Sequence, residues 1–345
     1  MKKKISLLVH GPLISKKKSI KHNCLEDLKL LFRYSNLFNY IIISTWKSED
    51  TINLEKYIKK KNIFIIKNKI PSKKSFSNSS LNPSKNKYLQ AYSVLRGLQF
   101  LKQLNIGENK KKNYVIKIRT DQKFNKLPIL KKYIQNKNIS NNSIYIRCFK
   151  RSLPFFLTDT ILIGKLEMLL KIFNHHYAQL QMYNNVHYDL FASLLKVVTP
   201  KKFMSSNLIF PSSFSLMFQE NRLTPKQLKL IKKLWLKNIY LIPKKIIYPF
   251  FWRGKQRSYS TNELYLEDLH PEHFERYFNY LIKKNTQTLQ YFNLFKYSFR
   301  LYFLNSSKRS IFMVGLFLQF FKNFSIECYY IYFQMRSLAK NLINN

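Results

Sequence analysis

The chain of 345 residues is 46% apolar and 16% aromatic, which is enough to bury a sizeable core and excludes a disordered polybasic protein. Lys and Arg number 61 against 17 Asp and Glu, so the formal net charge is +44. This charge indicates either an anionic partner, such as membrane headgroups or phosphorylated substrates, or a Lys-rich compositional bias of the whole chain.

Cysteine and glycine usage narrows the class of protein. Cys24, Cys148 and Cys328 lie far apart without CxxC spacing, which suits a reducing compartment and gives no disulfide or zinc framework. Only six glycines occur, so no Walker loop or GxGxxG fingerprint can be built, and HExxH and GxSxG motifs are absent. We expect a cytoplasmic protein, with peripheral binding to the inner face of the cell membrane left open.

Short apolar runs alternate with helical patterns over the first two-thirds of the chain. The opening run is shorter than the roughly 7–15 residues of a signal-peptide core, so it is read as a strand. The predicted strands are Ile5–His10, Tyr40–Trp46, Ile63–Lys67, Tyr114–Arg119 and Ile144–Cys148. This order predicts an α/β fold with a mostly parallel sheet flanked by helices.

One helix between the third and fourth predicted strands shows its buried face. Apolar residues recur there at helical spacing: Ala91, Val94, Leu95, Leu98 and Leu101. Gly107 is a plausible helix stop. The segment Pro71 to Lys87, rich in Ser, Asn and Lys, is long for a connection and is either a flexible lid or a disordered excursion.

Beyond about Pro211 the strand pattern fades and helical stretches dominate. The sequence therefore predicts a catalytic domain over residues 1–210 and a mainly helical, basic and aromatic region over residues 211–345. The latter either packs on the domain or lies on an anionic membrane surface. Its longest charge-free run, Ser310 to Phe321, is shorter than the ~18–20 residues that span a bilayer.

A helix start is expected at Pro271, which suits a first helical position. This helix start explains the nearby pair His270 and His273 better than a metal site does.

Polar features follow three of the predicted strands, at the edge where open α/β sheets bind ligands. They are His10-Gly11-Pro12, Ser44-Thr45-Trp46 and Arg119-Thr120-Asp121. Gly11 permits close approach of a ligand to the backbone, and Trp46 is suited to stack on a base or sugar. Each feature alone also has an ordinary explanation, as a turn, a core side chain or a cap.

Asp121 stands out because acids are scarce around it. Between Glu108 and Glu220 the acids are Asp121, Asp159, Glu167 and Asp189. Asp121 is suited to hold a divalent cation that bridges a diphosphate, or to accept a hydrogen bond from a sugar hydroxyl. Arg119 and Lys117 add positive charge for phosphates.

The chain resembles the WavE-type lipopolysaccharide synthesis proteins. The matching segments, in chain order between about Ile5 and Leu195, are ISLLVHGPL, IIISTW, NKYLQAYSVLRGL, VIKIRTD and FFLTDTILIGK. The resemblance implies a GT-A-like fold, which is that of nucleotide-diphospho-sugar transferases. It also implies a glycosyltransferase that moves a sugar from a nucleotide-diphospho-sugar donor to a glycan or lipid-linked acceptor.

The resemblance also implies roles for single residues. The implied donor-binding residues are Gly11, Pro12, Thr45, Trp46, Asn86, Gln90, Arg119 and Asp121. Asp159 would face the donor or acceptor sugar. On the later helix, Asp189 or His187 fills the position of the catalytic base, with Asp189 preferred and Asp159 second for an inverting reaction.

The chain departs from the family pattern on the later helix, which reads NVHYDLF in place of a Glu-Gln-like setting, and at two further positions. Many sugar transferases of this fold use an Asp-x-Asp pair for metal, whereas Arg119 stands two residues before Asp121. Mn²⁺ or Mg²⁺ at Asp121 is therefore an open expectation. Leu89 also replaces an Arg that the family pattern would place next to Gln90.

Two other classes of protein compete with the enzyme. A nucleic-acid-binding protein would stack Tyr and Phe on bases and follow the backbone with Lys. The charge is spread along the whole chain, however, and no RRM, KH or zinc-finger motif occurs, so no nucleic-acid partner is expected. A catalytically inactive scaffold on a membrane surface is the other alternative.

Overall fold

The computed structural model describes the following parts of the chain: residues 3–17, 20–56, 58, 62–71, 85–106, 113–137, 140, 142–150, 157–178, 186–199, 225–257 and 263–264. Several sequence predictions fall outside these residues. They are most of the predicted loop before the third helix, the stop at Gly107, the helix start at Pro271 and the run Ser310 to Phe321.

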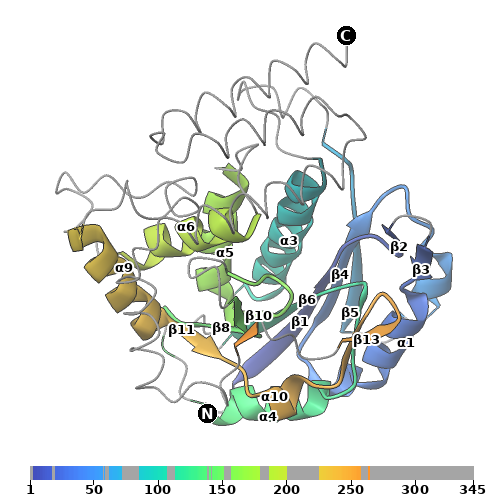
Figure 1. Ribbon diagram of the computed structural model, residues 1–345. Helices are drawn as coiled ribbons and strands as arrows, with labels where there is room; N and C mark the ends of the chain where they lie inside the picture. The colour runs from blue at the N-terminus through green and yellow to red at the C-terminus, as the bar shows by residue number, and fades with distance from the viewer. Residues whose placement is uncertain are drawn as a thin grey trace, which may run out of the picture.

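A seven-stranded sheet forms the centre of the fold (Figure 1). Its strands, in spatial order, are β11 (Ile239–Leu241), β8 (Ile144–Ile146), β10 (Leu162–Lys165), β6 (Asn113–Arg119), β1 (Lys4–His10), β4 (Ile41–Trp46) and β5 (Ile63–Asn68). All neighbours run parallel except β10, which is antiparallel to both β6 and β8. The predicted α/β class is confirmed, and each of the five predicted strands is present.

The strand order creates a switch point between β1 and β6. The chain passes from β1 to β4 and β5 on one side, and then crosses back to place β6 on the other side of β1. Register aligns the ends of the two strands, with His10 opposite Arg119. In open parallel sheets, the loops that diverge at such a point leave room for a ligand.

Helices cover both faces of the sheet (Figure 1). One face carries α3 (Lys85–Leu104), α5 (Leu166–Ala178), α6 (Val186–Val198) and α9 (Pro225–Asn238), which pack on Leu8, Ile42 and Val115. The other face carries α1 (Leu25–Arg33), α4 (Leu127–Asn136) and the short α10 (Lys244–Ile247), which pack on Leu7, Ile41 and Ile116. Two short helices, α2 (Ile52–Glu55) and η1 (Ser35–Leu37), lie in connections.

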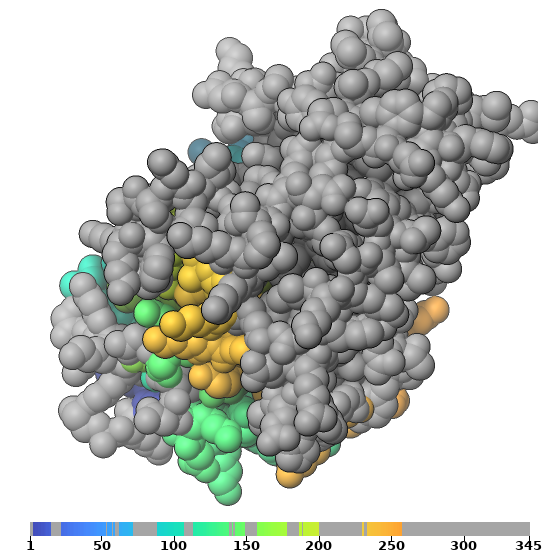
Figure 2. All heavy atoms as spheres, turned by 60° about the vertical axis from the view of Figure 1, so that its left-hand side comes forward, coloured from blue at the N-terminus to red at the C-terminus, as the bar shows by residue number. Residues whose placement is uncertain are grey.

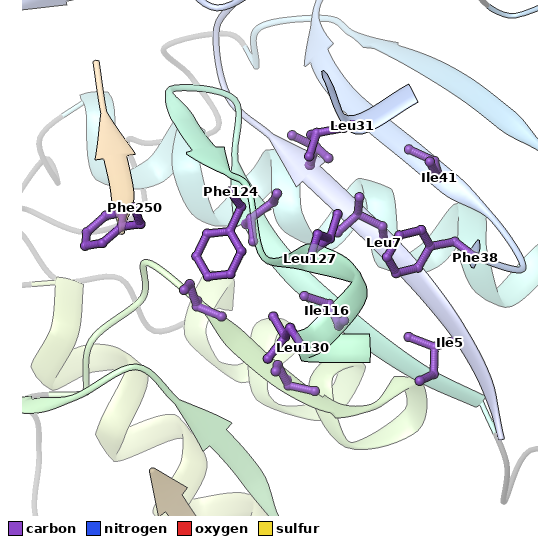
Figure 3. Packing of buried hydrophobic residues seen from close by; sticks show 14 of the residues in the cluster. Ile5, Leu7, Leu31, Phe38, Ile41, Ile116, Phe124, Leu127, Leu130 and Phe250 are labelled. Carbon is purple, nitrogen blue, oxygen red and sulfur yellow. The ribbon is translucent and has the colours of Figure 1, made fainter. Parts of the chain in front are cut away.

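The alternation of side chains along each strand explains these two cores. Figure 3 shows the second core, where Leu31 of α1 and Leu127 and Leu130 of α4 lie near Leu7 and Ile116 of neighbouring strands. Burial of such side chains contributes roughly 1.5–3 kcal/mol each before conformational entropy is subtracted.

Helix α3 has the face that the sequence predicts. Its five predicted apolar residues are all buried. Lys85 to Lys87, which the sequence analysis counts in the preceding loop, begin this helix instead. Gly97 allows α3 to touch β1, because a Cβ atom there would lie 2.3 Å from Leu8 Cδ1. This close contact therefore determines where the side chains of α3 lie relative to the carboxyl edge of the sheet.

A small sheet closes the carboxyl edge of β6. It contains β7 (Gln122–Phe124), β12 (Phe250–Trp252) and β13 (Lys255–Arg257), with β12 in the middle. Arg253 and Gly254 form the two-residue turn between β12 and β13, with φ angles of 53° and 72°. Positive φ at both positions is typical of the tight hairpin turn that matches strand twist.

Two strand pairs complete the described structure: β2 (Ile14–Lys17) with β3 (Ile20–Asn23), and β9 (Phe149–Lys150) with β14 (Glu263–Leu264). The first pair approaches the β12–β13 turn, since a Cβ atom on Gly254 would lie 3.2 Å from the His22 ring.

The segment after residue 238 extends the main sheet. Strand β11 pairs with β8, and Tyr240 stacks on Tyr145 at 5.2 Å between ring centroids. Figure 2 shows the yellow part of the chain, which holds α9 and β11, beside the green part that holds α4 and β8. The boundary at residue 210 therefore does not separate β11 from the sheet, and the division into two regions stays a prediction.

No helix in the described ranges is both long enough and apolar enough to cross a membrane.

Candidate functional site

The ends of β1 and β6 are tied together at the switch point. Gly11 has a φ of 127°, and a Cβ atom on it would lie 2.8 Å from Thr120 Oγ1. Thr120 donates from its backbone N to His10 O (3.0 Å) and from its hydroxyl to Pro12 O (2.6 Å). Gly11 is thus needed for close approach to the β6 end. This link brings the first and the fourth predicted strand ends together.

Asp121, directly after that link, is a buried carboxylate held by three side chains. Arg119 donates to it twice, from Nε to Oδ1 (2.9 Å) and from Nη2 to Oδ2 (3.0 Å). Trp252 donates from its indole Nε1 to Oδ2 (3.0 Å), and Arg253 from Nε to Oδ2 (3.1 Å). The backbone N of Arg253 also donates to Asp121 O (2.8 Å), which fastens the β12–β13 hairpin to the sheet edge.

These donors determine the charge state of Asp121. Burial by itself would raise the pKa of the carboxyl, but hydrogen bonds and charge from Arg119, followed by hydrogen bonds from Trp252 and Arg253, lower the pKa well below its ordinary value. Asp121 is therefore ionised throughout the neutral range.

The surroundings of Asp121 do not fit a divalent cation. Two guanidinium groups and an indole N–H already donate to the carboxylate oxygens that a metal ion would need as ligands. The positive charge of the guanidinium groups would also repel a metal cation. In the part of the chain that the structure describes, no three His, Cys, Asp or Glu residues gather as a metal-ligand group. Asp121 is therefore suited to hold the two arginines rather than a metal ion.

Trp252 also organises the two guanidinium groups. The carbon of the Arg119 guanidinium lies 6.0 Å from the Trp252 ring centroid, and that of Arg253 lies 5.5 Å away. Cation–π attraction at such distances contributes about 0.5–1 kcal/mol at partly exposed sites. We call Arg119, Asp121, Trp252 and Arg253 the arginine cluster.

Asp159 is the centre of a second buried group. Lys117 Nζ donates to the backbone O of Asp159 and lies 3.8 Å from its Oδ2. Gln90 donates from Nε2 to the same Oδ2. The ring of His187 approaches from α6, with Nδ1 3.6 Å from Asp159 Oδ1. We call Asp159, Lys117, Gln90 and His187 the Asp159 cluster.

The charges of the Asp159 cluster depend on one another. Burial lowers the pKa of Lys117 to about 8, although Asp159 opposes this shift. For Asp159, burial acts to raise the pKa, but Lys117 first and His187 second outweigh it and lower the pKa to about 2. Burial lowers the pKa of His187 below its usual 6.5 despite the nearby carboxylate, so its ring is neutral at pH 7.

The tautomer of His187 follows from its neighbours. Nδ1 lies 2.9 Å from the carbonyl oxygen of Leu157, which only accepts hydrogen bonds. Nδ1 therefore carries the proton in the neutral ring, and Nε2 is the basic nitrogen. A carboxylate behind Nδ1–H and a basic Nε2 are the arrangement of a positioned general base.

Hydrogen bonds connect this edge to the second strand end. His10 Nδ1 contacts Ser93 Oγ (3.2 Å), and Ser44 donates from Oγ to Ser93 O (2.6 Å). Asn68 donates to Ser44 Oγ and to Thr45 O. Burial first, then Lys117 and Arg119, lower the pKa of His10 far below its usual value, so His10 is neutral.

The predicted binding residues on β4 are buried among protein groups. The Thr45 side chain is fully buried, and Trp46 stacks on Tyr92 of α3 with 6.5 Å between ring centroids. Tyr92 in turn contacts Tyr88 and Tyr177. Contact of Thr45 or Trp46 with a donor stays a prediction.

Two other predicted residues lie on helices at this edge. Asp189 is buried in the first turn of α6, half a turn beyond His187, and its backbone O accepts from Ser193 Oγ (2.8 Å). Asn86 lies in the first turn of α3, and its side chain is outside the described part.

Trp252 and Arg253 were not among the predicted site residues. They lie more than a hundred residues beyond Asp121, in a region predicted to be mainly helical but broken by Pro243, Pro249 and a loop over Arg253–Asn262. A signal was present, because FFW and KQR flank the dipeptide Arg253-Gly254, and two strand-like runs separated by two such residues indicate a hairpin.

Comparisons with known proteins identify the family. The model of the family described as WavE lipopolysaccharide synthesis matches residues 5–202, which is more than half of the chain. The predicted recognition is therefore confirmed. No curated protein matches.

Solved structures show only remote likeness. One is a galactosyltransferase, LgtC, in complex with donor and acceptor sugar analogs (10% identity, 55% of this chain, 70% of that chain, TM-score 0.34). Another is 2-C-methyl-D-erythritol 4-phosphate cytidylyltransferase of Francisella tularensis (12% identity, 81% and 99%, TM-score 0.31). Likeness at this level does not establish the function of this chain.

Proposed function

Because the chain belongs to the WavE lipopolysaccharide synthesis family, we propose that it is a glycosyltransferase acting on a nucleotide-diphospho-sugar, with a glycan or lipid-linked acceptor in lipopolysaccharide synthesis. The observation that supports this best is the Asp159 cluster, in which a neutral histidine backed by a carboxylate lies beside the switch point of the sheet. Ligands of open α/β sheets bind at that point.

In the proposed reaction, His187 takes the proton of the acceptor hydroxyl at Nε2. The acceptor oxygen forms its bond to the anomeric carbon of the sugar while the bond from that carbon to the diphosphate breaks. Asp159 does not take the proton, because a carboxyl with a pKa of about 2 is too weak a base. It holds the His187 ring in place and stabilises the imidazolium that forms.

Glycosyl transfer passes through an oxocarbenium-like transition state, as glycoside hydrolysis does. Negative charge therefore grows on the leaving diphosphate, and fixed cations nearby lower the barrier. The side chain of Lys117 is only 1% exposed and is engaged by Asp159. Arg119, whose side chain is 21% exposed, is the better placed of the two to meet a phosphate.

Asp189 is the alternative base that the sequence favours. Its burial in the first turn of α6 is compatible with this role, but the contacts of His187 give the histidine a defined tautomer and a carboxylate partner. The variants Asp189→Asn and His187→Ala distinguish the two candidates. The base is the residue whose variant loses transfer while it retains donor binding.

A donor screen tests the proposed function itself. The full chain is incubated with UDP-, GDP- and CMP-sugars and with lipopolysaccharide-derived or lipid-linked acceptors, and products are followed by mass spectrometry. We expect transfer from one donor class, and addition of Mn²⁺ or Mg²⁺ serves as a separate arm. Absence of transfer and of binding heat with every donor, in folded protein, would contradict the proposal.

Three finer predictions accompany this function. They are a divalent cation as cofactor, for which the surroundings of Asp121 are unsuited, an anionic membrane surface as partner and a cytoplasmic position on the inner face of the membrane. None of them is needed for the chemistry proposed above.

A further inference from the structure

We propose that Arg253 and Arg119 form an anion clamp that binds the diphosphate of the donor, and that Asp121 and Trp252 hold the two guanidinium groups in place for it. This inference rests on the proposed function for the identity of the ligand. It assigns a binding role to Arg253, a residue of the β12–β13 turn.

The first observation is an excess of positive charge at a fixed position. Two guanidinium groups share a single carboxylate, and both donate to the same oxygen, Asp121 Oδ2. The arginine cluster thus carries one more positive than negative charge. A partly buried cation without a matching anion is unfavourable, so the cluster favours an anionic ligand.

The second observation is that the cluster has donors left over. Arg253 donates to the Asp121 side chain through Nε alone. In the described residues, neither of its terminal nitrogens has a hydrogen-bond partner. Its side chain is 23% exposed, so part of it is in contact with solvent. Arginine binds phosphate oxygens through parallel N–H bonds of this kind.

The third observation is an unsatisfied donor beside the two arginines. Gln122 lies opposite Trp252 in the strand register, and its Oε1 accepts from the backbone N of Arg119 (3.1 Å). Its Nε2 is buried and has no acceptor among the residues that the structure describes. Buried amide groups are normally paired, so this nitrogen adds to the demand for acceptor oxygens at the site.

The fourth observation is the backbone of Arg253. Its φ of 53° lies in the left-handed region, where a non-glycine residue is strained by about 1 kcal/mol. The turn therefore keeps an arginine at a position where glycine or asparagine would be more stable. A binding role for the side chain accounts for this strain.

Position in the fold agrees with a diphosphate ligand. Asp121 follows β6 directly, and Thr120 joins that strand end to Gly11 and Pro12 after β1. The clamp thus lies at the switch point. Its Arg119 also acts on Asp159, because the charge of Arg119 helps to lower the pKa of that carboxyl. A sugar attached to the bound diphosphate would remain on the same edge of the sheet as His187.

Inorganic pyrophosphate binding to the full chain, measured by calorimetry at low salt, tests the clamp. Arg253→Gln removes the charge and the fork but leaves Asp121 bonded to Arg119 and Trp252. We expect its affinity for pyrophosphate to fall at least ~10-fold. Lys255→Gln removes an equal charge from the same hairpin, at an exposed position, and should change affinity less than about 2-fold.

Unchanged pyrophosphate affinity in Arg253→Gln overturns the proposal. An equal loss of affinity in Lys255→Gln also overturns it, because binding would then depend only on net charge. If Arg253→Gln does not fold, the wild-type chain provides a second measurement. Phenylglyoxal modifies accessible arginines, and we expect pyrophosphate to protect Arg253 in peptide mass spectra. Modification of Arg253 at the same rate with and without pyrophosphate also overturns the clamp.

The donor screen keeps this result separate from the proposed function. Pyrophosphate binding that depends on Arg253, in a chain that transfers no sugar, retains the clamp and rejects the glycosyltransferase. Sugar transfer with donor affinity unaffected by Arg253→Gln retains the enzyme and rejects the clamp.

Discussion

Two aspartates at the same edge of the sheet are both buried, both ionised and both paired with a basic side chain, yet their surroundings differ. Asp121 is held by two arginines and an indole whose side chains reach the surface. Asp159 is held by Lys117, which is buried, and faces His187. In the roles proposed above, the first carboxylate fixes permanent cations for a ligand, whereas the second positions a base for proton transfer.

The kind of base near each carboxylate accounts for this difference. Arginine keeps its charge in any protein environment and offers a rigid fork, so an Asp–Arg cluster is a constant electrostatic feature. Burial changes the pKa of lysine and histidine: it lowers the pKa of Lys117 to about 8 and the pKa of His187 below its usual 6.5. In the proposed enzyme, the arginine cluster therefore serves binding and the Asp159 cluster serves proton transfer.

The largest effect is expected from His187→Ala. Loss of the general base should lower kcat by roughly 10³-fold, within the usual range for general base catalysis, while donor affinity stays within a few-fold of wild type. Steady-state kinetics with the donor found in the screen measures both quantities. Full turnover by this variant would assign proton transfer to another group, with Asp189 the next candidate.

Asp121→Asn should show the opposite pattern, a loss of stability. The change leaves Arg119 and Arg253 without their carboxylate, and removal of one partner from such a buried pair costs about 3 kcal/mol or more. Urea unfolding measures the loss. Glu55→Gln is the control, because it breaks an ion pair to Lys67 at the surface, and it should change the unfolding midpoint very little.

Acid unfolding should reveal the lowered pKa of Asp159. Its pKa is about 2 in the folded chain against 3.8 for the free side chain, so it stabilises the fold above pH ~4. This contribution, about 2 kcal/mol, is lost as the pH falls from ~4 to ~2. Asp159→Asn should remove that part of the pH dependence. The exposed Asp50→Asn is the control and should keep it.

The smallest effect is expected in the pH dependence of transfer. Because the pKa of His187 is lowered, the rate should fall only when the pH drops below 6.5. Asp159 raises the pKa of His187, so Asp159→Asn should move this acid limb to lower pH. A limb that stays in place would show that Asp159 has no electrostatic contact with the base.

The fold was largely predictable because its strands carry strong local signals. β1, β4 and β6 are buried runs rich in Ile, Leu and Val, and β5 is a partly buried apolar run at the sheet edge. All four appear within about a residue of their predicted bounds. β10 and β11 were not predicted. Each is only a few residues long, and β10 owes its antiparallel direction to pairing with β6 and β8 rather than to its own sequence.

The site was predictable where its residues follow strands. Arg119 and Asp121 end a clear strand, and Gln90 lies on a helix with an evident buried face, so their common edge could be inferred. The partners within that edge could not. Arg253 reaches Asp121 only because the β12–β13 hairpin pairs with β7, a contact across more than a hundred residues that leaves no local pattern.

The pairing of β11 with β8 limits how the chain can be shortened. A truncation after residue 238 would remove the strand that covers β8 and leave that strand's N–H and C=O groups open to other chains, which is the usual origin of edge-to-edge aggregation. It would also delete the hairpin that carries Trp252 and Arg253. A soluble catalytic fragment must therefore extend through at least residue 257.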